Sequence, residues 1–245
     1  SLNQPDFSFY ATSSDSKLRF VSTLTNNAKE NNEFEIHSHF DEFEIYHFVK
    51  GELSFAFEGT RLDIKDGTMV IISKGTLHRP IIKEPCVYYR KRLLFSKELF
   101  AGFDLSQFDF YNALTSSKIM VFDAKTVFEL QLGVLFNEIE ENLRKQTVYG
   151  DFCAMVALFS FLIKAVKSGR PLNADSFELH NDKILEIIRY INDNLTNELS
   201  YKEIADRFFF SEKSLYKFFK KNTGFSLSAY IKERRIIKSQ ELLIS

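Results

Sequence analysis

Residues 199–224 read LSYKEIADRFFFSEKSLYKFFKKNTG, and this stretch decides the fold of the C-terminal quarter of the chain. It opens with the pattern S-x-x-E at Ser200 and Glu203, which is a capping box. In such a box the serine hydroxyl accepts the backbone N–H of the glutamate, and the glutamate side chain accepts the N–H of the serine. The sequence therefore predicts a short helix over Tyr201–Phe208.

The second half of the stretch predicts another short helix after a tight turn at Phe208–Phe210. Ser211 caps a helix over Glu212–Asn222, and Gly224 ends it, because glycine tolerates the left-handed conformation that follows many helices. Its apolar side consists of Leu215, Phe218 and Phe219. Its polar, basic side consists of Lys213, Ser214, Tyr216, Lys217 and Lys220. Two short helices joined by a tight turn, the second with a basic face, form the helix-turn-helix pattern.

The residues around this stretch carry an unequal share of the charge. Residues 183–245 hold 12 Lys and Arg against 8 Asp and Glu, a net charge of +4, whereas the other 182 residues hold 20 against 25. A basic C-terminal part on an acidic body is typical of a nucleic-acid-binding module joined to another domain. Further helices are predicted over Asp182–Leu195, with an isoleucine stripe, and over Leu227–Leu243.

Four groups of residues in this region resemble the AraC-type transcription regulators over about 60 residues. They are Ile188-x-x-Ile191, Leu199-Ser200-x-x-Glu203-Ile204-Ala205, Ser211-x-x-x-Leu215-x-x-Phe218-Phe219-Lys220-Lys221-x-Thr223-Gly224 and Tyr230-Ile231-x-x-x-Arg235. The resemblance implies two helix-turn-helix units joined by a long helix. The second unit would follow Ser245 and is not in this sequence. In such a unit the second helix is the recognition helix, here called the reader helix. A chain with only one reader helix is expected to bind DNA weakly and with poor specificity.

By the same resemblance, Lys213, Tyr216 and Lys217 occupy positions that face base edges in double-stranded DNA. Lysine can donate to guanine O6 or N7, which agrees with that role. Ser214 belongs to the same face. Lys220, Lys221 and Arg235 are expected to meet phosphate or solvent. The alternative is that these residues form an ordinary solvated helix face.

Residues 7–95 predict a sandwich or barrel of about eight strands, because short apolar segments recur at about 8–12-residue spacing between turns. The segments are Phe7–Ala11, Lys17–Thr25, Phe34–Ser38, Phe43–Val49, Glu52–Glu58, Thr68–Ser73, Leu77–Ile82 and Cys86–Phe95. The turns contain Gly51, Gly59, Gly67 and Gly75.

Within these strands, His37, His39 and Glu44 lie in the spacing H-x-H-x4-E-x6-G, and His78 follows Gly75. The pattern resembles the two motifs of cupin barrels, in which three histidines and the glutamate bind one metal. His37 and His39 point the same way from a strand, and this donor set suits Fe, Mn, Ni or Zn.

The pattern also departs from the cupin motifs. Asn31, Ser73 and Ile82 replace their usual glycine, proline and asparagine. A divalent metal is therefore one possibility. The other is a sensing barrel in which Glu44 serves strand register and the histidines line an effector pocket.

The residues beside Glu44 predict the lining of such a pocket. If Glu44 faces the barrel interior, Tyr46 and Phe48 face it too, because alternate residues of a strand share a face. The candidate pocket of His37, His39, Glu44, Tyr46, Phe48 and His78 suits a small organic effector. The alternative is that the aromatic residues are only core. His47 is expected to face outward, and residues 88–92 (YYRKR) to form a solvated sheet face.

Residues 96–168 predict helices that pack on the barrel. A short helix follows Ser96 over Lys97–Phe103, a longer one runs from Asp123 to Arg144, and another covers Tyr149–Lys167. The expected apolar positions of the second are Val127, Leu130, Val134, Leu135, Ile139 and Leu143, and those of the third are Phe152, Met155, Val156, Phe159, Ile163 and Val166. This hairpin has enough apolar surface for the barrel and a homodimer partner.

The sequence thus predicts an α+β protein of two domains. Residues 1–95 form a cupin-like barrel, 96–168 a helical dimerisation region, 169–180 a linker and 181–245 the DNA-binding part. The predicted function is a ligand-responsive, DNA-binding regulator and not an enzyme. The alternatives are a metal-dependent cupin enzyme and a dimeric adaptor that binds no DNA.

The chain shows no secretion signal or apolar run of membrane-spanning length, and Cys86 and Cys153 are unpaired in the sequence. A cytoplasmic protein without a membrane partner is therefore expected. No Ser-His-Asp or Cys-His constellation, phosphate loop or dinucleotide fingerprint is evident.

Overall fold

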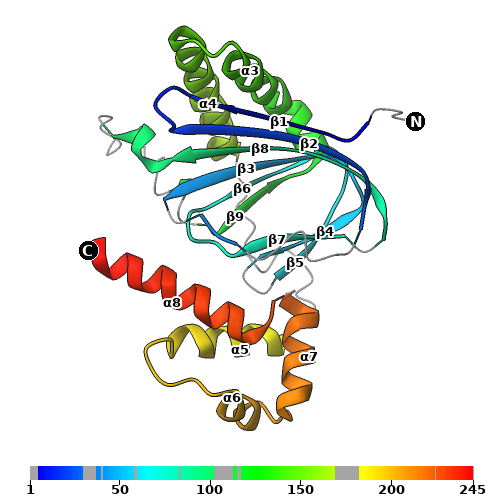
Figure 1. Ribbon diagram of the computed structural model, residues 1–245, viewed down its shortest axis with the longest axis vertical. Coiled ribbons are helices and arrows are strands. Elements are labelled where there is room, and N and C mark those ends of the chain that lie inside the picture. The colour runs from blue at the N-terminus through cyan, green and yellow to red at the C-terminus, as the bar shows by residue number, and fades with distance from the viewer. Residues whose placement is uncertain are drawn as a thin grey trace.

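The structure is a computed structural model that describes residues 5–29, 37–39, 41–57, 60–82, 84–101, 113–114, 117–168, 182–223 and 225–244. It has the predicted mixed α+β architecture, with a strand-rich N-terminal part and a helical C-terminal part (Figure 1). The positions of Asn31, Gly59 and Gly224, most of the strand predicted over Phe34–Ser38 and the linker 169–180 lie outside the described residues.

Two antiparallel sheets form the barrel. The larger has the order β1-β2-β8-β3-β6-β9 and the smaller the order β5-β4-β7. The bounds are β1 Phe7–Thr12, β2 Leu18–Ala28, β3 Glu42–Lys50, β4 Leu53–Phe57, β5 Thr60–Ile64, β6 Thr68–Ile72, β7 His78–Ile82, β8 Cys86–Ser96 and β9 Ile119–Phe122. β4 and β6 are buried along their whole length.

Two strands were not among the predicted ones. β5 is short and carries Arg61 and Asp63, so its sequence reads as a polar loop. β9 pairs antiparallel with β6, with Met69 opposite Phe122. The barrel sheet therefore extends beyond the predicted boundary at residue 95 and includes a segment assigned to the helical region.

The helical hairpin covers the outer face of the large sheet (Figure 1). Its helices are α2 Ala124–Glu129, α3 Leu132–Arg144 and α4 Val148–Ser168, preceded by a 3-10 turn, η1, at Lys97–Phe100. The predicted caps at Ser96 and Asp123 are present. The continuous helix predicted from Asp123 to Arg144 is wrong, because Gln131 adopts a left-handed conformation (φ 58°) and separates α2 from α3.

The inner face of α4 differs from the predicted one. Its buried residues, which pack against α3 and the sheet, include three alanines and a glycine: Gly150, Ala154, Ala157, Leu158, Phe161, Leu162 and Ala165. Of the predicted stripe, Phe152, Val156 and Ile163 are instead exposed, at 58%, 49% and 45%. Alanines allow the helices to approach closely, so the larger side chains are left on the outer face.

By length and composition, α4 is also apolar enough to cross a membrane, with 39% of its most apolar window buried inside the protein. The expectation that no segment reaches that length is therefore wrong.

Four helices form the C-terminal part, with a core of their own (Figure 1). They are α5 Asp182–Asp193, α6 Tyr201–Arg207, α7 Glu212–Thr223 and α8 Leu227–Ile244. Both halves of the Ser200–Glu203 capping box are present. The predicted isoleucine stripe of α5 is buried, as are Leu215 and Phe219 of α7. The turn between α6 and α7 places Phe209 at φ 59° with 93% of its surface exposed.

His47, expected to face outward at the surface or at an interface, lies between the sheet and α3. Its ring meets Phe136 edge-on at 6.1 Å between centroids. Burial, together with the charge of Lys91 on the neighbouring strand, lowers the pKa of His47 to about 4. Lys91 in turn donates to Glu140 of α3 at 2.8 Å. The imidazole is therefore neutral at pH 7 and belongs to the packing under the hairpin.

Candidate functional site

Three histidines and a glutamate converge at one end of the barrel. Glu44 lies on β3 and His78 begins β7, while His37 bridges to His78 through backbone hydrogen bonds of 3.3 and 3.0 Å. One potential ligand atom from each of His37, His39, Glu44 and His78 lies within 4.8 Å of the others. The predicted cluster is thus brought together from segments far apart in the sequence.

Glu44 is the centre of this cluster and is 1% exposed. Its Oε2 lies 2.9 Å from Nε2 of His78 and 3.4 Å from Nε2 of His39. Burial alone would raise the pKa of Glu44, but the contacts with His39 and His78 and the charge of Arg92 hold it well below its usual value. The carboxylate is therefore ionised inside the barrel.

The hydrogen bonding of His78 orients its ring. Nδ1 lies 2.9 Å from the carbonyl oxygen of Thr76, so it carries the proton of that bond. Nε2 is thereby directed at Glu44. Metal-binding histidines are commonly held in this way, with one ring nitrogen donating to a carbonyl and the other turned to the ion.

The donor set fits a divalent transition metal. Three imidazoles and one carboxylate suit Fe, Mn, Ni or Zn. Two buried atoms, Nε2 of His39 and Oε1 of Glu44, also lack a well-aligned hydrogen bond within the described part of the chain. An ion between the four side chains would satisfy both.

The barrel interior beside the cluster is aromatic and basic. Tyr46 and Phe48 face it, as predicted, and stack with centroids 4.3 Å apart. The Tyr46 hydroxyl lies 2.7 Å from that of Tyr88 on β8. Both tyrosines are buried, which raises the pKa of each, so their hydroxyls are protonated.

Two arginines of β8 also point inward, and the expected solvated face over residues 88–92 is wrong for them. Arg92 lies opposite Tyr46 in the β3–β8 register, and its NH1 is 3.6 Å from Oε1 of Glu44. Arg90 lies over the ring of Tyr88 at 4.6 Å. The sequence shows that successive side chains of this strand point to opposite faces. The pairing with β3 decides which of the two faces is the interior one.

The predicted DNA-facing residues lie on α7. Lys213, Ser214, Tyr216, Lys217 and Lys220 are all exposed, whereas Leu215 and Phe219 between them are fully buried. Ser214 also belongs to the helix cap, since its N–H donates to Oγ of Ser211 at 3.2 Å. The helix therefore presents the predicted basic face outward from its own module.

Arg235 on α8 is engaged differently. Its Nε donates to the carbonyl of Leu195 at 2.9 Å, and its NH2 group donates to that of Asn197 at 2.8 Å. The guanidinium thus holds the loop between α5 and α6. These hydrogen bonds give Arg235 a structural role that requires no contact with DNA.

A short segment joins the histidine cluster to the helical module. The N–H of Gly75 donates to the carbonyl of His39 at 2.7 Å. Two residues later, Leu77 has no exposed surface and packs in the core of the C-terminal helices. Nothing in the sequence predicts this, because Leu77 reads as the start of a strand.

The fold and site define a class of protein: a cupin barrel with a three-histidine, one-glutamate cluster, joined to a helix-turn-helix module. Comparison with known proteins agrees. The cupin domain family matches residues 27–89. The multiple antibiotic resistance protein MarA of Escherichia coli K12 is 34% identical over 71 residues, which are 29% of this chain and 52% of MarA. The chain therefore spans about half the length of this relative.

A longer match is the lactose operon transcription activator of Staphylococcus xylosus, 23% identical over 82% of this chain and 70% of that protein. Among solved structures, the AraC-like transcriptional activator CuxR covers 96% of this chain and 81% of its own, with 18% identity and a TM-score of 0.48. The chain carries a cupin domain and resembles AraC-type transcription regulators, as its motifs predicted.

Proposed function

We propose that the protein is a DNA-binding transcription regulator whose cupin domain senses a small molecule. One observation carries the proposal: the neighbours Leu77 and His78 belong to the two different sites. His78 contacts Glu44 in the barrel, while Leu77 is buried among the helices that hold the reader helix α7. A ligand that moves His78 would therefore also act on Leu77 and on the helices around it.

The coupling would act as a shift between two populations. An effector or ion that repositions His78 also repositions residues 73–77, since the Gly75 N–H is tied to His39. Such a ligand can only shift the equilibrium by its difference in affinity for the two arrangements. Effector binding in the barrel would thus alter the presentation of α7 to DNA.

We also propose that His37, His39, Glu44 and His78 hold a divalent metal ion, because their donor atoms converge. The ion would act as a Lewis acid that anchors an oxygen atom of the effector. Arg92 and Tyr46 beside it would orient that molecule. The same convergence favours the second candidate, a metal-dependent cupin enzyme, but an enzyme has no use for a capped, basic reader helix.

The DNA-binding part is tested by Lys217→Ala in the full-length protein. The variant is expected to bind its operator more weakly, and the slope of log K against log salt should flatten by about 0.9 for the phosphate contact that is lost. The operator would be selected from a random DNA pool, and affinities measured by fluorescence anisotropy.

Lys65→Ala provides the matched control, since Lys65 is exposed on the barrel. If Lys217→Ala leaves the affinity and the salt slope unchanged, Lys217 does not contact DNA. If the protein selects no DNA sequence from the random pool, the proposed function is contradicted.

The outer face of α4 supports a homodimer. Tyr149, Phe152, Val156 and Ile163 follow one another at helical spacing and are all exposed. A contiguous apolar stripe of this kind marks an interaction surface, and a second copy provides a matching one. The inner face of α4 is part of the protein core, so we infer a cytoplasmic dimer rather than a membrane-spanning helix.

Phe152→Asp is expected to weaken this dimer about 30-fold or more, because a charge replaces a central aromatic contact. Sedimentation over a range of concentrations measures the change. Phe128→Asp, at an exposed phenylalanine of α2, serves as the control. A wild-type protein that sediments as a monomer at micromolar concentration would contradict the dimer.

A further inference from the structure

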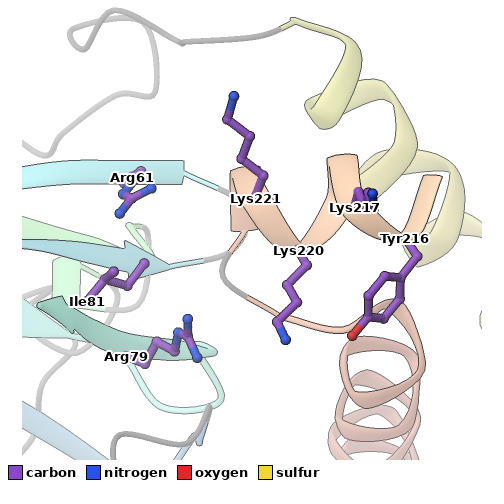
Figure 2. Close-up of a pocket in the computed structure, with 7 residues that line it drawn as sticks. All are labelled: Arg61, Arg79, Ile81, Tyr216, Lys217, Lys220 and Lys221. Carbon is purple, nitrogen blue, oxygen red and sulfur yellow. The ribbon is translucent and has the colours of Figure 1, made fainter. Parts of the chain in front are cut away.

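A cleft lies between the small sheet of the barrel and the reader helix α7. Figure 2 shows Arg61 of β5 with Arg79 and Ile81 of β7 on one side, facing four residues of α7 on the other. The α7 residues are Tyr216, Lys217, Lys220 and Lys221. The cleft has a volume of about 380 Å³. Domain interfaces are common places for small-molecule sites, and this volume falls at the small end of their range.

The charge of this cleft has one sign. Five of its seven lining residues are Lys or Arg, and none of the seven is acidic. Nε of Arg61 is buried and has no hydrogen-bond partner within the described residues. Cations on the barrel side thus face cations on the helix side, and their mutual repulsion opposes the arrangement. A negative ligand between them would reverse the sign of that interaction.

We propose that this cleft binds a small organic polyanion that carries two or more phosphate groups. Arginine donates to phosphate in a bidentate fork, and lysine adds a compact charge, so Arg61 and Arg79 would hold one phosphate while Lys220 and Lys217 reach another. The Tyr216 hydroxyl supplies a neutral donor at the edge. The volume admits a metabolite, whereas a DNA duplex, whose major groove alone is about 12 Å wide, is too large.

The consequence for DNA rests on the proposed function. Lys217 and Lys220 line the cleft and also belong to the predicted DNA-facing side of α7. One ammonium group cannot contact the polyanion and a DNA phosphate together. A bound polyanion therefore bridges barrel and reader, holds them in this arrangement, and lowers the affinity for DNA.

The binding site is tested by calorimetric titration of the full chain with sodium pyrophosphate at constant ionic strength. The wild type is expected to bind one pyrophosphate saturably, and the double variant Arg61→Gln, Arg79→Gln to bind it about tenfold or more weakly, because charged hydrogen bonds are lost. Lys65→Gln, directly after β5 but outside the cleft, should leave the affinity unchanged.

The same variants decide between competing explanations. The arginine double variant leaves the histidine cluster intact, so pyrophosphate held by a metal there would not respond to it. Equal affinity in all three proteins, or no saturable binding, would overturn the proposal. The thermal unfolding midpoint of each protein without pyrophosphate shows whether the variants are folded, and single substitutions at Arg61 or Arg79 replace a double variant that is not.

A second measurement tests the link to DNA. Pyrophosphate is expected to raise the Kd for a selected duplex about tenfold in the wild type and hardly at all in the double variant. If the double variant loses DNA affinity as strongly as pyrophosphate affinity, nucleic acid is the occupant and the small-molecule site is refuted. Arginine-dependent pyrophosphate binding in a protein that binds no DNA would support the site and refute the regulator.

Discussion

The variant His78→Ala is expected to lose the metal ion that we propose for the wild-type barrel. His78 supplies one of four donor atoms that lie within 4.8 Å of one another. Changes even to outer-shell partners of a metal ligand cost 10–100-fold in affinity, so removal of a ligand should cost on the order of 100-fold or more. Metal analysis of protein purified without a histidine tag should therefore fall from about one ion per chain to a trace.

The choice of variants keeps this test informative. Alanine at His78 removes a partner of the buried Glu44 carboxylate, and an unpaired buried charge can unfold a protein. His39→Gln is the gentler second variant, because the His39 side chain is 21% exposed and lies 3.4 Å from the carboxylate. His47→Gln, a histidine outside the cluster, serves as the control and should keep the ion. If the wild-type protein contains no bound metal, the metal centre is refuted. The same four residues would then be interpreted as part of an effector pocket.

Replacement of Phe136 by alanine is expected to lower the free energy of unfolding by about 3–5 kcal/mol, the usual cost of removing a buried phenylalanine. Phe136 has no exposed surface. Its ring meets Phe20 of the large sheet at 5.4 Å and Phe161 of α4 at 6.0 Å. It therefore fills the junction of the sheet with both helices of the hairpin, and its loss leaves a cavity that these three elements cannot close.

Urea denaturation followed by circular dichroism measures this change. Phe128→Ala is the matched control, because Phe128 lies on α2 with 83% of its surface exposed, where substitutions usually alter stability by less than about 0.5 kcal/mol. A loss below 1 kcal/mol in Phe136→Ala would show that the hairpin is not packed on the sheet as described. A weaker dimer in the same variant would follow from the displaced α4.

The elements that the sequence predicted best are those fixed by local interactions. The S-x-x-E box at Ser200 and the cap at Ser211 each involve residues three apart, so the starts of α6 and α7 follow from the sequence. Strand alternation likewise placed Glu44, Tyr46 and Phe48 on one face. The predicted helix of residues 123–144 was wrong where Gln131 interrupts it, since the left-handed residue is a glutamine and the nearby Gly133 lies inside α3.

The choice between two similar faces depended on the tertiary structure. α4 has apolar residues on both sides, and the side with alanines packs inward because close approach of α3 requires small side chains. In β8, Arg90 and Arg92 turn inward because pairing with β3 sets the register. A hydropathy pattern cannot make either choice, because it contains no information on which surface lies opposite.

The reader helix α7 has features that the sequence determines and a position that only the tertiary structure determines. Its caps, its apolar side and its basic face are written into residues 199–224, because each depends on neighbours within a few positions. The placement of that face opposite Arg61 and Arg79 came only from the tertiary structure, as did the burial of Leu77 among the C-terminal helices. These contacts join residues more than 100 positions apart, and no local rule relates them.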